Sequence, residues 1–176
     1  SGSDIYLTID YNIQRKSEEI LSQAKKDFNI KSGLIVVMDP STGKIMALAN
    51  YPFFDANKYY EEQDYKVFQN SAIQQLYEPG SVFKAITMAS ALNEGKVTPE
   101  TVYTDTGLIK IGGLTIANFH NAKYGQETMT QVLEKSINTG AVFAQRQVGN
   151  GSFMEYVKRF GFFEPTIIDL YVDIFS

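Results

Sequence analysis

Apolar and polar residues in the first half of the chain follow two different periods. Between residues 11 and 29 the apolar side chains recur at helical spacing, which predicts an amphipathic helix capped by Asp10. The stretch before it, "YLTID" at 6–10, predicts a short strand. "GLIVVMDPSTGKIMALA" at 33–49 contains two apolar runs around a turn and predicts a β-hairpin. Residues 51–75 have no clean period and predict an irregular, partly helical segment.

Helical patterns dominate the second half. "SVFKAITMASALNEG" at 81–95 predicts a helix that is apolar on nearly all sides, and such a helix is expected to be buried. Residues 103–120 predict short strands with glycine turns. Three shorter helices are expected after them: one from Thr128 with a Thr128–Gln131 capping box, one over 139–148 that ends at Gly149, and one with a Ser152–Glu155 capping box that ends at Gly161.

Composition narrows the chemistry that the chain can perform. The 176 residues are 44% hydrophobic and 20% charged, as in an ordinary globular domain, with no repeat or linker to mark a boundary. A net charge of -4 and the lack of any Lys/Arg cluster give no indication of nucleic-acid binding. The absence of cysteine excludes disulfides and thiolate metal sites, and His120 alone cannot form a His-based metal site. Acid–base chemistry therefore depends on Lys, Asp, Glu or Ser.

The tetrad Ser-x-x-Lys occurs three times, at 22–25, 41–44 and 81–84. The first lies on the predicted solvated face of the first helix, and the second straddles the hairpin turn, so both have ordinary structural explanations. At 81–84 the spacing places Ser81 and Lys84 on one face of a helix start. Burial of that helix would desolvate Lys84 and lower its pKa, which is how a lysine becomes a base near neutral pH. The alternative is that Ser81 caps the helix and Lys84 extends its amine to solvent.

A second constellation lies downstream of this tetrad. "KSINTG" places Ser136 and Asn138 in a predicted loop between two helices, where side chains can reach a cleft. A serine hydroxyl can relay a proton, and an asparagine amide can bind a peptide group. Alone the tripeptide is weak evidence, because Ser and Asn are common loop residues. Together with Ser81 and Lys84 it predicts a site for nucleophilic catalysis.

These motifs and their flanks resemble the transpeptidase domain of the class B penicillin-binding proteins. That group combines Ser-x-x-Lys with a Ser-x-Asn motif and a later Lys-Thr-Gly motif. "YLTIDYNIQRKSEEIL", "VVMDPSTGKIMALANYPFFDANKY", "YEPGSVFKAITMASALNEG" and "FMEYVKRFGF" are all similar to segments of the domain. The resemblance implies a mixed α/β fold of the serine β-lactamase and penicillin-binding-protein class, with helices flanking an antiparallel sheet. Residues 4–170 would form a partial domain, 1–3 a cloning remnant and 171–176 an atypical tail.

The resemblance also implies a role for each residue of the candidate site. Ser81 would attack the carbonyl of a D-Ala-D-Ala stem peptide of peptidoglycan, and Lys84 would accept its proton. Ser136 would relay a proton to the leaving amine, and Asn138 would bind the substrate amide. β-Lactams would acylate the same serine. No cofactor or metal is implied. The parent protein is expected outside the cytoplasm, anchored by an N-terminal transmembrane helix, with other cell-wall synthesis proteins as partners.

The sequence departs from the resemblance at the third motif. It contains neither Lys-Thr-Gly nor Lys-Ser-Gly, and "STGK" at 41–44 has another order on another element. In the family that motif lies on the sheet strand that supplies a second oxyanion N–H. We therefore expect an incomplete sheet and a weakly active or inactive isolated chain.

Other functions are less well supported by the residues. A non-catalytic penicillin-recognising sensor or scaffold would share the fold, and whether Ser81 is acylated distinguishes it from the enzyme. A β-lactamase is a third possibility, but no glutamate is obviously placed to activate a water. A phosphate-binding loop at "STGK" fails, because Met38 and Ile45 occupy positions that require Gly and Ser or Thr.

Overall fold

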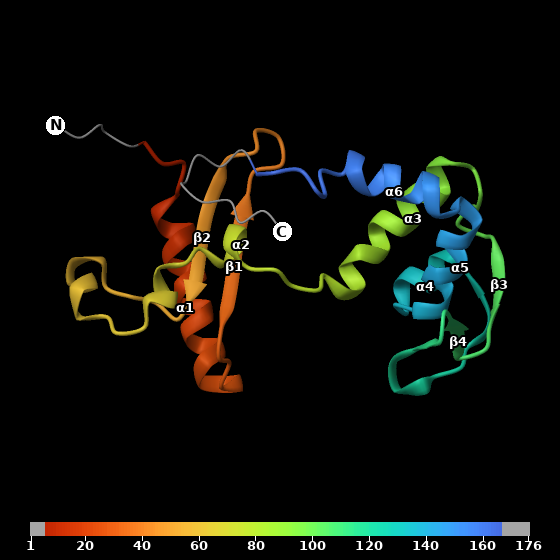
Figure 1. The fold of residues 1–176 in the computed structure, drawn as a ribbon, viewed down its shortest axis with the longest axis horizontal. Coiled ribbons are helices and arrows are strands. Elements are labelled where there is room, and N and C mark those ends of the chain that lie inside the picture. The colour runs from red at the N-terminus through yellow and green to blue at the C-terminus, as the bar shows by residue number, and fades with distance from the viewer. Residues whose placement is uncertain (1–5, 167–176) are drawn as a thin grey trace. The chain divides into compact units, whose positions relative to one another are not determined.

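The computed structural model describes residues 6–166, and these residues belong to two compact units (Figure 1). One unit spans Tyr77–Glu164, and the other consists, among the described residues, of 6–76 together with 165 and 166. The predicted cloning remnant at 1–3 and the atypical tail at 171–176 lie outside the described residues.

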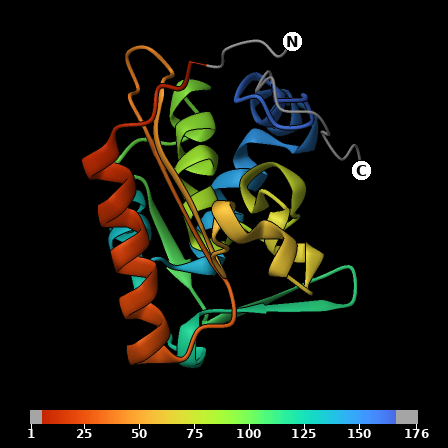
Figure 2. The same cartoon turned by 90° about the vertical axis from the view of Figure 1, so that its left-hand side faces the viewer.

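The first unit is a helix packed on a hairpin, as the sequence predicts. Helix α1 (Tyr11–Phe28) runs beside the antiparallel strands β1 (Gly33–Met38) and β2 (Ile45–Tyr51) (Figure 2). The Asp10 side chain accepts hydrogen bonds from two backbone N–H groups of the first turn, which confirms it as the cap. The interface buries Leu21 of α1 and the β2 side chains Ala47 and Ala49.

Two further predictions concern the flanks of this unit. The strand predicted at 6–10 is wrong: the segment is irregular, and Asp10 N–H donates to the Met46 carbonyl at 2.9 Å. Thr8 Oγ1 also donates to the Ile45 carbonyl, and these isolated bonds tie the segment to β2 before Asp10 redirects it into α1. The prediction for 51–75 is confirmed by three short elements: η1 (Ala56–Glu61), η2 (Tyr65–Phe68) and α2 (Ser71–Gln74).

The second unit packs helices around a small apolar core. The buried core residues lie between positions 88 and 148 and include Met88, Ala91, Tyr103, Met129, Val132, Ile137 and Ala144. Its elements are η3 (Gly80–Phe83), α3 (Lys84–Asn93), β3 (Val102–Asp105), β4 (Leu108–Ile111), β5 (Leu114–Ala117), η4 (Phe119–Asn121), β6 (Gly125–Thr128), α4 (Met129–Glu134), α5 (Asn138–Val148) and α6 (Asn150–Arg159).

The described strands form three antiparallel pairs: β1 with β2, β3 with β6, and β4 with β5. Helices and antiparallel strands together confirm the mixed α/β class. The capping box of Thr128 and Gln131 at the start of α4 is also confirmed, as is the end of α5 at Gly149.

Two expectations for the second unit are wrong. Within its own unit, helix α3 is not buried on all sides: it packs against α5 and α6 through residues such as Met88 and Ala91, while Val82 just before it is 75% exposed and Leu92 is 40% exposed. Its neighbours within the unit cover only one face. The Ser152–Glu155 capping box does not form, because Gly149, at φ 82°, turns the chain from α5 directly into α6, which begins at Asn150.

Candidate active site

The amine of Lys84 lies within hydrogen-bond distance of the other three residues that the sequence selects. Its Nζ donates to Ser81 Oγ at 3.1 Å, to Ser136 Oγ at 2.9 Å and to Asn138 Oδ1 at 2.6 Å. The Ser136 carbonyl lies 2.7 Å away and is a fourth acceptor. Because an ammonium has three N–H groups, four oxygens compete for its protons. These residues all belong to the second unit.

A short 3-10 turn places Ser81 over Lys84. The turn η3 spans Gly80–Phe83, and Gly80 enters it at φ 63°, a conformation that glycine adopts without steric cost. Residues three apart eclipse one another in a 3-10 helix, so the Ser81 hydroxyl comes directly above the Lys84 side chain. The Lys84 N–H donates to the Ser81 carbonyl and continues the chain into α3.

Ser136 reaches Lys84 through an unusual backbone conformation. It lies in the turn between α4 and α5 at φ 55°, a left-handed value that costs a non-glycine residue about 1–2 kcal/mol. Its N–H donates to the Leu133 carbonyl, and the next N–H, of Ile137, donates to Val132. The turn thereby directs both the carbonyl and the hydroxyl of Ser136 to the lysine.

Asn138 is the first residue of α5, so this helix begins one residue earlier than the predicted start at 139. Its Nδ2 donates to the Ala117 carbonyl at the end of β5, at 2.7 Å. Because that contact needs the N–H side of the amide, Oδ1 must face Lys84. The strand end therefore fixes which end of the amide the lysine meets.

The electrostatics of Lys84 follow from its surroundings. Burial lowers the pKa of Lys84 from its usual value of 10.5, in the direction that the sequence predicts. Among the described residues no carboxylate forms an ion pair with this amine. Its partners are neutral oxygens, so desolvation is not offset by an opposite charge. A lysine of lowered pKa within hydrogen-bond reach of an exposed serine hydroxyl can act as a general base.

The other two tetrads do not form comparable clusters. Lys25 donates to Asn29 along helix α1 at 2.8 Å. Ser41 and Lys44 lie in the β1–β2 turn, which Asp39 organises by accepting hydrogen bonds from Ser41 N–H and Thr42 Oγ1. These contacts confirm the structural explanations of the tetrads at 22–25 and 41–44, a helix face and a hairpin turn.

Sequence reasoning missed two main-chain partners of the site: the carbonyls of Ser136 and Ala117. A carbonyl carries no side-chain signature, and only the folded backbone shows where it points. His120 is exposed in η4 beside the Phe119 ring, consistent with a loop residue.

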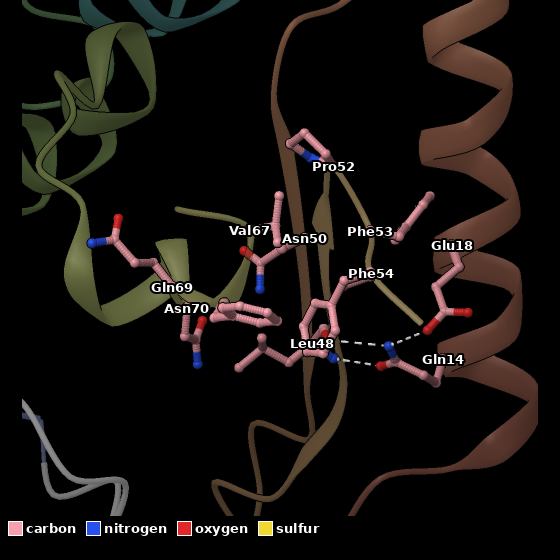
Figure 3. Close-up of a pocket in the computed structure, with 12 residues that line it drawn as sticks. Gln14, Glu18, Leu48, Asn50, Pro52, Phe53, Phe54, Val67, Gln69 and Asn70 are labelled. Carbon is pink, nitrogen blue, oxygen red and sulfur yellow. Dashed lines mark hydrogen bonds between the residues drawn. The ribbon is translucent and has the colours of Figure 1, made fainter. Parts of the chain in front are cut away.

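The first unit contains a pocket of its own, of about 260 Å³ (Figure 3). Among its lining residues, Gln14 of α1 accepts a hydrogen bond from the Leu48 N–H at 2.8 Å and donates one to the Leu48 carbonyl at 3.1 Å. The aromatic cluster of residues 50–60 contributes Phe53 and Phe54, and Phe54 packs edge-to-face on Phe68.

Within residues 6–166, no group of three or more His, Cys, Asp or Glu could hold a metal ion. No described helix is long and apolar enough to cross a membrane.

Comparison with known proteins assigns the chain to a family. The chain belongs to the penicillin-binding protein transpeptidase domain family, which it matches over residues 33–174. It is 32% identical over 170 residues to stage V sporulation protein D of Bacillus subtilis, covering 96% of this chain and 26% of that protein. It is equally identical over 169 residues to penicillin-binding protein PbpB of Mycolicibacterium smegmatis, again covering 96% and 26%.

A solved structure shares the fold. The D,D-transpeptidase domain of a peptidoglycan glycosyltransferase from Eggerthella lenta superimposes with a TM-score of 0.81 at 31% identity, over 98% of this chain and 41% of that one. The chain thus spans about a quarter of the length of the curated relatives described above.

Proposed function

We propose that the protein is a peptidoglycan D,D-transpeptidase that works through an acyl-serine intermediate. The observation that carries this proposal is the convergence of Ser81, Ser136 and Asn138 on the desolvated amine of Lys84. Family membership and the D,D-transpeptidase named in the similar structure support the substrate class.

In the acylation step, Ser81 Oγ attacks the carbonyl of the penultimate D-Ala, and its proton passes to neutral Lys84 Nζ, 3.1 Å away. The tetrahedral intermediate then breaks the peptide bond. The proton moves from Lys84 through the Ser136 hydroxyl, 2.9 Å away, to the departing amine of D-Ala. The products are free D-Ala and an ester on Ser81.

In the second step an amine of a neighbouring stem peptide attacks the ester. The proton path runs in reverse, so the amine loses a proton and Ser81 regains one. The net result is a new peptide crosslink. Asn138 holds Lys84 in place and offers its amide to the substrate backbone. β-Lactams would acylate Ser81 by the same first step.

Oxyanion stabilisation sets the expected rate. The backbone N–H of Ser81, in the first turn before α3, is one donor for the developing negative charge. The sequence contains no Lys-Thr-Gly or Lys-Ser-Gly to supply a second. Removing one such donor costs about 2.7–4 kcal/mol of transition-state stabilisation. The isolated chain should therefore react slowly or not at all with stem peptides.

The test is covalent labelling by a fluorescent penicillin, followed by intact-mass analysis. Wild type should gain the mass of one penicillin, Ser81→Ala none, and Ser41→Ala, which alters another Ser-x-x-Lys, should label like wild type. An unlabelled, folded wild-type chain would contradict acylation. Labelling that survives in Ser81→Ala would contradict the assigned nucleophile. A folded full-length protein that is not acylated at Ser81 would instead indicate a non-catalytic sensor or scaffold.

We further propose that the protein acts outside the cytoplasm at the inner-membrane surface, where peptidoglycan is assembled, with other cell-wall synthesis proteins as partners. The support is its kinship with proteins named for peptidoglycan synthesis and sporulation. Alkaline phosphatase fused to the full-length protein should be active if the domain is exported, and a cytoplasmic reporter at the same position should be inactive.

A further inference from the structure

Outside the Lys84 cluster, the most completely satisfied buried charge in the second unit is Asp105. Its carboxylate ends β3 and has no exposed surface. Oδ1 accepts from the Gly107 N–H at 2.9 Å and from Thr139 Oγ1 at 2.6 Å. Oδ2 accepts from Asn118 Nδ2 at 2.9 Å and from the Tyr124 N–H at 2.8 Å. Four donors saturate a carboxylate, which has about four lone-pair sites.

Two of these four donors adjoin the residues of the site. Thr139 directly follows Asn138, and Asn118 directly follows Ala117, whose carbonyl accepts from the Asn138 amide. Thr139 N–H also donates to Asn118 Oδ1 at 3.2 Å, so the two segments are joined again beside the carboxylate. Asp105 therefore holds both sides of the hydrogen bond that orients the Asn138 amide.

From this geometry we propose that Asp105 is a positioning residue for the lysine–asparagine pair, acting through Thr139 and Asn118. It sets the first turn of α5 against the end of β5, and this contact directs Asn138 Oδ1 to Lys84. The inference rests on the proposed function for its catalytic consequence, though not for the positioning itself.

The chemistry of the site requires a carboxylate rather than an amide. All four of its partners are donors, and an asparagine would present its own NH₂ to two of them. Desolvation raises the pKa of Asp105, but the hydrogen bonds from Thr139, Tyr124, Gly107 and Asn118 outweigh it and hold the pKa below its usual value. The group is therefore a permanent acceptor at neutral pH.

The first experiment compares penicillin acylation of the chain with that of Asp105→Asn and a matched control, Tyr156→Phe. The control removes a buried hydroxyl that donates to Glu94 at 2.7 Å in the same unit, away from Lys84. We expect acylation by Asp105→Asn to fall about ten- to hundredfold, as for a displaced catalytic group. Its pH midpoint should move lower, since the ammonium loses an acceptor. Tyr156→Phe should keep both the rate and the midpoint.

A gentler pair protects the test against misfolding. Thr139→Val removes the hydroxyl that binds Asp105, and Thr139→Ser retains it. Slow acylation in the valine variant with recovery in the serine variant supports the proposal. It is overturned if Asp105→Asn and Thr139→Val acylate like wild type, or if they slow no more than Tyr156→Phe.

A spectroscopic readout separates this proposal from the proposed function. In the side-chain amide NMR spectrum, Asp105→Asn should displace the Asn138 resonance, and a titration of ¹³C-labelled lysine should show an altered Lys84 pKa. Tyr156→Phe should change neither. If wild type is not acylated at all, the transpeptidase proposal fails, yet these signals still decide whether Asp105 positions the pair. Unchanged signals in Asp105→Asn would overturn it.

Discussion

The Asn138 amide is shared between a strand end and a lysine: its Oδ1 lies 2.6 Å from Lys84 Nζ, and its Nδ2 lies 2.7 Å from the Ala117 carbonyl. The lysine therefore has a strong neutral partner whose orientation is held from the other side. Because that partner has no net charge, it fixes the position of the amine without the large rise in pKa that a carboxylate would cause.

The first prediction concerns the pH dependence of acylation by penicillin. Lys84 must be neutral to take the Ser81 proton, so the rate should rise with pH through the pKa of Lys84. Burial lowers this pKa from 10.5, and the midpoint of the profile should accordingly lie below 10.5. Stopped-flow acylation between neutral and alkaline pH measures it. A rate that falls as pH rises over that range would contradict Lys84 as the base.

Asn138→Asp should displace the same midpoint to higher pH. A carboxylate close to an ammonium favours the charged form and raises a lysine pKa by about 1–3 pH units. At neutral pH the variant should acylate more slowly, with part of the rate recovered in alkaline buffer. Asn93→Asp is the matched control, since Asn93 lies at the far end of α3 and contacts Tyr156 instead. Equal midpoints in the two variants would show that Asn138 does not tune the lysine.

Much of the first unit can be predicted from sequence because its determinants are local. The cap at Asp10, the apolar face of α1 and the turn residues between β1 and β2 lie within a few positions of the elements that they define. The expected strand at 6–10 fails because strand formation requires a partner ladder, and periodicity says nothing about whether one is available.

The candidate site is only partly encoded in local pattern. Spacing and family resemblance select Ser81, Lys84, Ser136 and Asn138, and the structure brings all four together. The φ of 55° at Ser136 is set by the α4–α5 turn rather than by its residue type. Asp105 is still harder to find, because one of its main partners, Thr139, lies 34 residues away.

The free energy of unfolding should depend unequally on the two partners of the ion pair next to Ser136. Lys135 Nζ lies 2.6 and 2.8 Å from the carboxylate oxygens of Glu127; the glutamate side chain is 6% exposed and the lysine 39%. Lys135→Met leaves a buried carboxylate without its cation, whereas Glu127→Gln leaves a lysine that can turn to solvent. The methionine variant should lose more free energy of unfolding, by about 1–3 kcal/mol, because an unsatisfied buried acceptor bears its full desolvation cost.

Urea unfolding of both variants measures this difference. The exposed pair Lys58 and Glu61, 4.0 Å apart, is the control, and breaking it from either side should change stability by less than about 1 kcal/mol. Equal losses in Lys135→Met and Glu127→Gln would contradict the asymmetry. Since Lys135 precedes Ser136, both variants should also slow acylation.

Gly140 permits the close approach of α5 to α4 that places Asn138. A Cβ added there would lie 2.4 Å from Val132 Cγ2 and 2.9 Å from the Tyr103 hydroxyl oxygen, both contacts that require a shift. Gly140→Ala should cost about 1–3 kcal/mol of unfolding free energy, the usual penalty for overpacking a core, and should slow acylation as α5 moves.

Gly151, in α6, is the control, because a Cβ added there meets nothing within 4 Å. Gly151→Ala should instead stabilise the chain by about 0.5–1 kcal/mol, because alanine is the better helix former. Chemical denaturation and penicillin labelling of the two variants provide the measurement. If Gly140→Ala proves as stable as wild type and labels at the same rate, the position of Asn138 does not depend on this contact.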